Sequence, residues 1–161
     1  MFRISDTVIY CGTQLCVIAD IRDESFGGVK KPYYILKPVY DKNSTLYHPV
    51  DLANGKIRLP VSGQEAKKLV ENKTAAELEW ISSDPLRKEH FSLLLKESDP
   101  RILVAMIRLI HSKRTELAQN GKRLRAADEK AFSEAKKTVS EELSFALGTD
   151  RENVIDMILG N

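Results

Sequence analysis

The stretch "IRLPVSGQEAKKLVEN", residues 57–72, decides the fold, because the spacing of its apolar residues changes at Ser62. Residues 57–61 follow an Asn-Gly turn signal and have the apolar, branched character of a β-strand. Ser62 and Glu65 then have the spacing of a capping box, which opens a helix. Strand patterns precede this point and helix patterns follow it. The sequence therefore predicts an α+β protein, in which a small antiparallel β-barrel or sheet is followed by an all-α helical bundle.

Upstream of Ser62, short β-branched and aromatic runs alternate with turn signals. The runs are "DTVIY" (6–10), "LCVIADI" (15–21), "PYYILKPVY" (32–40), "LYHPV" (46–50) and "IRLPV" (57–61). A Gly-Gly pair inside "SFGGVKK" (25–31) predicts a tight turn between two of them. Five short strands at this spacing predict a strongly bent barrel or sheet, a kind of module that usually serves as a binding platform.

Downstream of Ser62, helix start and stop signals divide the chain. Asp84 and Asp99 each precede a proline, which predicts an aspartate N-cap with proline at the first helical position. Helices are expected at residues 63–72, 85–97, 100–119, about 126–147 and 152–160. The predicted domains are a β-domain at 1–62, a helix and connector at 63–83, and a helical domain at 84–161.

Two of these helices carry most of the apolar residues of the helical half. The helix from residue 100 is apolar over most of its circumference, which predicts a central helix packed on several sides. The next helix has a single apolar stripe, formed by Phe132, Ala135, Val139, Leu143 and Ala146. Together they predict the core of a bundle.

Composition limits the class of protein. The chain has 161 residues, of which 42% are hydrophobic and 30% charged, as expected for a packed soluble core. No apolar run approaches the roughly 18 residues that a membrane-spanning helix needs. The start, "MFRISDTVIY", has no apolar segment of the signal-peptide kind. We therefore expect a cytoplasmic protein without a membrane partner.

The sequence offers no constellation for catalysis. It contains no phosphate-binding glycine motif and no metal-binding motif of regular spacing. His48, His90 and His111 lie on different predicted elements, and each is expected to be a satisfied or half-buried histidine. Cys11 and Cys16 are better explained as two buried small side chains than as a disulfide or a zinc pair. We expect a protein that is not an enzyme and that has no metal and no cofactor.

The charge distribution is uneven although the formal net charge is only +2. Residues 84–125 hold ten Lys/Arg and five Asp/Glu, whereas residues 126–161 hold four and eight. Within "NGKRLRAADE" (120–129), Lys122, Arg123 and Arg125 either complement helix ends or bind phosphate. Arg87 and Lys88 lie in the first turn of a predicted helix, where a cation opposes the helix dipole and a phosphate would be stabilised. This pattern favours binding of a polyanion on one face.

Several segments, in order and spacing, resemble a known family. They are "FRISDTVIYCGTQLCVIADI" (2–21), "YYILKP" (33–38), "LYHPV" (46–50), "KESDPRILVAMIRLIHSKR" (96–114) and "LRAADEKAFSEAKKTVSEELSFAL" (124–147). The chain thus resembles, over nearly its whole length, the CarD (CdnL) family of bacterial transcription regulators. The N-terminal domain of that family is shared with the transcription-repair coupling factor.

The resemblance implies a function in two parts. A Tudor-like N-terminal domain would bind the β subunit of RNA polymerase. The helical domain would contact the backbone and minor groove of promoter double-stranded DNA at the upstream edge of the transcription bubble, largely independently of sequence, and stabilise the open complex. The alternative is a protein–protein adaptor on RNA polymerase, whose helices bind protein rather than DNA. A monomer or weak dimer is expected, since an exposed strand edge could pair with a second copy.

The resemblance also assigns candidate residues. The two arginines that the family commonly uses against polymerase correspond to Glu24 and Tyr47, and Arg22 lies nearby. The tryptophan that the family commonly wedges beside an unpaired base corresponds to Leu86. Trp80 lies six residues earlier, either as a packing residue or as a DNA-facing residue. The full set of candidate DNA-binding residues is Trp80, Leu86, Arg87, Lys88, Arg101, Arg108, Lys113, Arg114, Lys122, Arg123 and Arg125.

Overall fold

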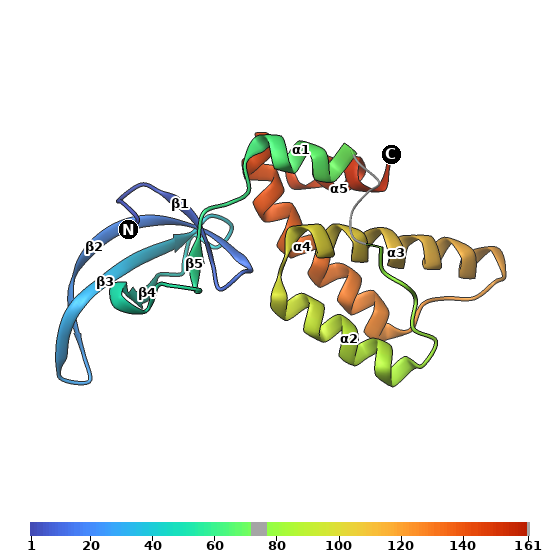
Figure 1. Ribbon diagram of the computed structural model, residues 1–161, viewed down its shortest axis with the longest axis horizontal. Helices are drawn as coiled ribbons and strands as arrows, with labels where there is room; N and C mark the ends of the chain where they lie inside the picture. Colours follow the sequence, from blue (N-terminus) through green and yellow to red (C-terminus); the bar gives the residue numbers. More distant parts are fainter. Residues whose placement is uncertain (72–76, 161) are drawn as a thin grey trace. The chain divides into compact units, whose positions relative to one another are not determined.

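The computed structural model describes residues 1–71 and 77–160. The chain forms two compact units, Met1–Pro60 and Val61–Asn161 (Figure 1). Residues 72–76, at the end of the first predicted helix and in the predicted connector, lie outside the described residues, as does residue 161. The α+β class is confirmed, with strands in the first unit and helices in the second.

The first unit is an open five-stranded antiparallel sheet rather than a closed barrel (Figure 1). Its strand order is β4-β3-β2-β1-β5. The strands are β1 (Thr7–Tyr10), β2 (Gln14–Phe26), β3 (Val29–Pro38), β4 (Leu46–Pro49) and β5 (Ile57–Arg58), with a short 3-10 helix η1 (Val50–Leu52). Two strands are longer than the short strands that we predicted, and these two form a hairpin.

Two local features set the geometry of the β2–β3 hairpin. Gly27 and Gly28 both have positive φ, 63° and 80°, and they connect the paired residues Phe26 and Val29. This confirms the Gly-Gly turn, because a two-residue hairpin loop of this kind needs positive φ at both positions. A register shift between Ile18 and Asp20 marks a β-bulge, which decides which β2 side chains lie on each face of the sheet.

One face of the sheet carries the core of the β unit. Val8, Cys16, Ile18, Tyr34 and Leu36 are almost completely buried there. Because residues paired across antiparallel strands lie on the same face, the bulge places Asp20, Arg22, Glu24 and Phe26 together on the opposite, outer face.

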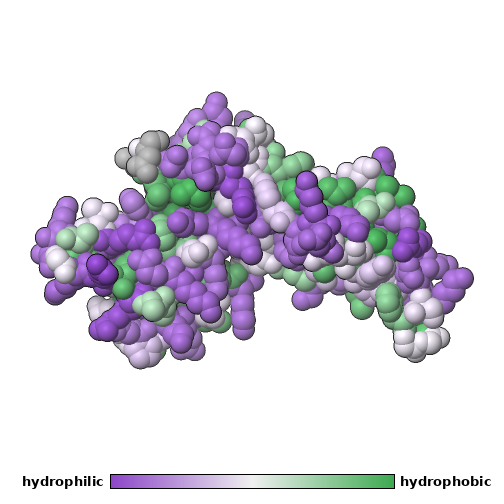
Figure 2. All heavy atoms as spheres, turned by 180° about the vertical axis from the view of Figure 1, so that it is seen from behind, coloured by the Kyte–Doolittle hydropathy of each residue, from purple (hydrophilic) through white to green (hydrophobic). Residues whose placement is uncertain are grey.

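The second unit is a helical bundle. Its helices are α1 (Gly63–Glu71), α2 (Asp84–Glu97), α3 (Pro100–Gln119), α4 (Ala126–Leu147) and α5 (Arg151–Leu159). Both core predictions are confirmed, since α3 is buried on most sides and the α4 stripe from Phe132 to Leu143 is buried, with Ala146 partly buried. Hydrophilic side chains cover most of this unit on the face shown in Figure 2. Among the described residues, no helix is long and apolar enough to cross a membrane.

The observed helix caps agree with the predictions at two positions and differ from them at a third. The backbone N–H of Ser62 donates to the Glu65 carboxylate (3.1 Å) and that of Glu65 donates to the Ser62 hydroxyl (3.2 Å), so the capping box is confirmed. Asp99 caps α3 as predicted and accepts from the N–H of Arg101. The prediction for Asp84 is wrong, because Ser83 is the N-cap of α2 and Asp84 is the first helical residue. The Asp84 carboxylate instead binds two arginines.

Candidate nucleic-acid interface

Three helix ends lie at the same end of the helical unit. They are the N-terminus of α2, the C-terminus of α3 and the N-terminus of α4 (Figure 1). The Arg125 guanidinium, just before α4, lies 3.4 Å from the Asp84 carboxylate at the start of α2. We call the five exposed residues Leu86, Lys88, Lys122, Arg123 and Arg125 the helix-end corner.

The loop between α3 and α4 holds the corner cations in place. After α3, Gly121 adopts a positive φ of 66°, and the N–H of Lys122 donates to the carbonyl of Leu117 (2.8 Å). Leu124 is buried in the core of the bundle, which fixes the loop between the two helices. Lys122 and Arg123 are exposed on this anchored loop. The loop therefore presents its cations from a defined backbone.

Arg87 is not available to DNA, so its prediction as a phosphate contact is wrong. The side chain is only 3% exposed, and its Nε and Nη2 donate to both oxygens of Asp128, each at 2.8 Å. Its Nη1 donates to the carbonyl of Ile81 (2.8 Å), and Nη2 also donates to Asp84 (2.7 Å). The hydrogen bonds to Asp128 raise the pKa of Arg87 against the opposing effect of burial. Asp84 and Asp128 thus neutralise the charge of Arg87, the role that the sequence predicts for a phosphate.

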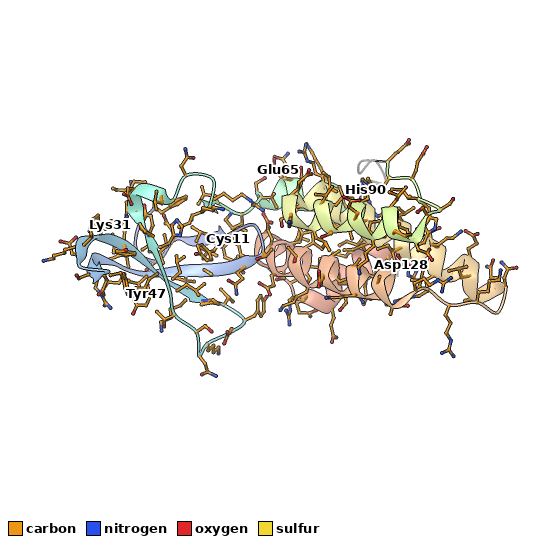
Figure 3. All side chains as sticks on the ribbon, turned by 90° about the horizontal axis from the view of Figure 1, so that it is seen from below. Cys11, Lys31, Tyr47, Glu65, His90 and Asp128 are labelled. Carbon is orange, nitrogen blue, oxygen red and sulfur yellow. The ribbon has the colours of Figure 1, made fainter. Side chains whose placement is uncertain are left out.

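Asp128 is the residue that sequence reasoning missed. It is 2% exposed and lies on α4 where that helix passes α2 (Figure 3). The sequence contains a signal for this burial. Asp128 stands four residues before Phe132, which places its carboxylate on the core-facing side of α4. A carboxylate at a core-facing position predicts a buried cationic partner.

Trp80 packs within the helical unit. Its ring lies 4.3 Å from the Arg87 guanidinium carbon and in an edge contact with Phe91, with ring centroids 6.1 Å apart. The Lys113 ammonium is 5.7 Å from the same ring. The tryptophan is half-buried against the core. These contacts favour the packing alternative for Trp80, and they leave Leu86, 59% exposed, as the large apolar side chain presented at the corner.

Arg108, a second predicted DNA contact, is half-buried and bonded to backbone carbonyls. Its Nε donates to the carbonyl of Ile158 (3.0 Å), and its Nη2 donates to the carbonyls of Leu69 (3.2 Å) and Val70 (3.1 Å). These carbonyls lie at the C-terminal ends of α5 and α1, where helices lack intrahelical donors. Burial lowers the pKa of Arg108 from its ordinary value. These bonds favour a structural role, in which the guanidinium joins two helix ends.

The remaining helical candidates surround the corner or lie apart from it. Lys113 pairs with Glu116, and Arg114 pairs with Glu129 and lies over the buried Phe132 ring, so carboxylates balance both charges. Arg101 is exposed and pairs with Asp99. It lies at the N-terminus of α3, whereas the corner lies at the C-terminus of that helix, about 30 Å away for 20 residues. Arg101 is therefore not part of the helix-end corner.

In the β unit, the three predicted polymerase-binding residues share the outer face. Arg22 pairs with Tyr33 across the hairpin, Glu24 pairs with Lys31, and Tyr47 pairs with Ile35. Arg22 donates to Glu24 (2.6 Å) and Asp20 (3.2 Å). Lys31 and Tyr47 are labelled on this unit in Figure 3. The fold thus brings the candidates to one surface.

The cysteines and histidines form no candidate site. Cys11 and Cys16 are not joined by a disulfide, and Cys11 is exposed, so the prediction that both are buried is wrong for Cys11. His48 contacts the Tyr10 hydroxyl (3.4 Å) and the Leu52 carbonyl (3.0 Å). Over residues 1–71 and 77–160, no three His, Cys, Asp or Glu side chains gather in a way that could hold a metal ion.

No protein-family model matches the chain, and no curated protein matches it. The resemblance to the CarD family rests on the segments quoted above alone and stays a hypothesis.

Proposed function

We propose that the protein is a non-enzymatic transcription regulator that bridges RNA polymerase and promoter DNA. Its β unit, acting as a Tudor-like docking module, binds the β subunit of RNA polymerase. Its helical unit contacts double-stranded DNA at the upstream edge of the transcription bubble and stabilises the open complex. The observation that carries this proposal is the helix-end corner, where exposed cations and an exposed leucine lie at the same end of the helical unit.

The charge of the corner suits contacts with phosphate. It contains four cations, and the only carboxylate that pairs with any of them among the described residues is Asp84, which binds Arg125. Lysine and arginine that neutralise phosphates release counterions, so affinity does not depend on sequence and falls with salt. Four such contacts give weak binding alone. Docking on polymerase would supply the high effective concentration that makes weak contacts sufficient.

Leu86 suits a contact with the bases. Proteins that bind the minor groove often insert an apolar side chain between base steps and unstack them. Leu86 is in the first turn of α2, and the buried Arg87–Asp128 pair beside it fixes that turn against α4. Because the backbone of this turn is already fixed, an apolar side chain on it loses less conformational entropy on binding than one on a mobile loop.

Charge reversal within α2 tests the proposal. Lys88→Glu is expected to shorten the lifetime of the open complex and to lower the slope of log K against log salt concentration by about one, because one phosphate contact is lost. The matched control is Lys96→Glu, an exposed lysine at the other end of α2. If both variants and the unmodified protein give the same open-complex lifetime and the same salt dependence, Lys88 does not contact DNA and the DNA-binding part of the proposal fails.

The adaptor alternative is favoured by one observation. Leu86 and Leu93, seven residues apart on α2, are both more than half exposed and so share one side of that helix. An exposed apolar row of this kind suits a groove on a protein partner. Under this alternative, binding is insensitive to salt and Leu93→Ala weakens it as much as Leu86→Ala.

A further inference from the structure

Four side chains of alternating charge form a series of contacts from the core of the helical unit to its surface. At the buried end, both oxygens of Asp128 accept from the Arg87 guanidinium, each at 2.8 Å. The Nη2 of Arg87 also donates to Oδ1 of Asp84 at 2.7 Å. The other oxygen of Asp84, Oδ2, lies 3.4 Å from Nε of Arg125 at the surface.

Asp84 places a carboxylate among the cations of the helix-end corner. Its side chain is 52% exposed. Lys88 follows it by four residues, so the two share one side of α2, and Leu86 lies between them in the sequence. Because Arg87 is itself bound to Asp128, the Asp84 carboxylate is held in a defined position. The corner therefore carries a negative charge next to its proposed phosphate contacts.

This carboxylate opposes the binding of phosphate in two ways. It is paired with the Arg125 guanidinium, so a phosphate that binds Arg125 has to compete with Asp84. It also lies in the first turn of α2, where the positive end of the helix dipole would otherwise stabilise a phosphate. A carboxylate and a phosphate repel each other over about a Debye length, which covers the corner.

We propose that the Asp84 carboxylate inhibits DNA binding by the free protein. It keeps the affinity for double-stranded DNA low, so that the corner contacts DNA only where polymerase holds the protein. This inference rests on the proposed function and specifies how its DNA-binding site is regulated. Docking on polymerase raises the effective concentration of DNA, and phosphates can then compete with Asp84 for Arg125. Without polymerase, the protein is not retained on the large excess of other DNA.

Other roles of Asp84 predict different results. Its bond to Arg87 stabilises the start of α2, and a role limited to that bond predicts a change in stability without a change in affinity. Its contact with Arg125 could instead orient that guanidinium toward phosphate, in which case removing the carboxylate weakens DNA binding. Only inhibition predicts tighter binding when the charge of Asp84 is removed.

The test measures binding of the full chain to a short labelled DNA duplex by fluorescence anisotropy, without polymerase and at several salt concentrations. Asp84→Asn removes the charge and keeps an oxygen that accepts from Arg87. It is expected to bind about two- to fivefold more tightly, and the slope of log K against log salt concentration is expected to steepen by up to about one.

The matched control is Asp99→Asn, which makes the same change in net charge at an exposed carboxylate–arginine pair and keeps a good N-cap for α3. Asp99 is separated from the corner by the length of α3, about 30 Å, whereas salt screens charges over about 10 Å. We therefore expect Asp99→Asn to leave the affinity for the duplex nearly unchanged.

Two further variants show whether the effect acts through Arg125. Asp84→Glu keeps the charge and is expected to bind as the unmodified protein does. In an Arg125→Gln background, Asp84→Asn is expected to give a smaller gain, because the carboxylate no longer has this guanidinium as a partner. Urea denaturation followed by the fluorescence of Trp80, the only tryptophan, shows that each variant is folded in the binding assay.

The remaining outcomes separate this inference from the proposed function. If Asp84→Asn binds the duplex no more tightly than the unmodified protein does, the inhibitory role is wrong. Equal gains for Asp84→Asn and Asp99→Asn assign the effect to net charge and overturn the inference too. In either case, an open complex whose lifetime the unmodified protein lengthens leaves the proposed function intact. If the unmodified protein does not lengthen that lifetime and no variant binds the duplex, both fail.

Discussion

Replacing Arg87 with methionine tests the buried ion pair that holds the corner together. The substitution keeps a long apolar stem and removes the guanidinium, which makes two hydrogen bonds to Asp128, one to Asp84 and one to the Ile81 carbonyl. Asp128, 2% exposed, then stays buried without its cation. Breaking a buried pair in this way typically reduces stability by about 3–5 kcal/mol. We expect a loss of that size, which is a large part of the stability of an ordinary domain, about 5–15 kcal/mol.

The assay is urea denaturation followed by tryptophan fluorescence. Trp80 is the only tryptophan, and it packs within the helical unit, so its signal reports on that unit. The expected result is a lower midpoint at an unchanged slope. The matched control is Arg101→Met, which removes an exposed arginine from a surface ion pair and is expected to change stability by less than about 1 kcal/mol.

A double substitution separates the ion pair from general packing. Arg87→Met with Asp128→Leu removes both charges, so no buried charge is left alone, and we expect it to be more stable than Arg87→Met by itself. A loss below about 1 kcal/mol for Arg87→Met, or a double variant no more stable than the single one, would refute the claim that this pair fixes α2 against α4.

Three further outcomes are expected. Arg108→Met leaves the carbonyl groups at the ends of α1 and α5 without their donor, and should lower the free energy of unfolding by about 2–3 kcal/mol in the same urea assay. Leu86→Ala should shorten the lifetime of the open complex and leave the urea midpoint nearly unchanged, since the side chain is exposed; a shifted midpoint would count against a surface role. Burial, followed by the nearby Cys11, raises the pKa of Tyr10 above its ordinary value of 10.0. The folded state therefore holds the Tyr10 proton more tightly than the unfolded state does. The contribution of Tyr10 to the free energy of unfolding is fully present below pH 10 and falls above it. Thermal melting between about pH 9 and pH 11 should show a smaller fall for Tyr10→Phe.

Local signals in the sequence predicted the elements well because short-range chemistry fixes them. The capping box at Ser62, the Asp99 cap and the Gly-Gly hairpin each depend on residues within four positions of one another. The α+β class was predicted from the change in the spacing of apolar residues along the chain. The helical core was predicted from the apolar faces of two helices. The sequence left the choice between a barrel and an open sheet undecided, because closure into a barrel depends on strand pairing that local patterns do not specify.

The candidate site was predicted only in outline because burial is a tertiary property. Arg87 and Lys88 are adjacent in sequence and equally cationic, yet one is buried against Asp128, 41 residues away, and the other is exposed. Arg108 is a cation on α3, but its guanidinium donates to carbonyls at the ends of two other helices. The bulge in β2 likewise decides which face carries Glu24. Each of these depends on partners distant in the chain.

The central claim, that the helix-end corner contacts promoter DNA, is tested most directly by photo-cross-linking in the complex with RNA polymerase. A photoreactive amino acid replaces Leu86 in one variant and Leu93 in another, since both side chains are about equally exposed on α2 and only Leu86 belongs to the corner. The account predicts a cross-link from position 86 to DNA at the upstream edge of the bubble and little from position 93. A cross-link from position 86 to protein alone, or equal DNA cross-linking from both positions, would contradict it.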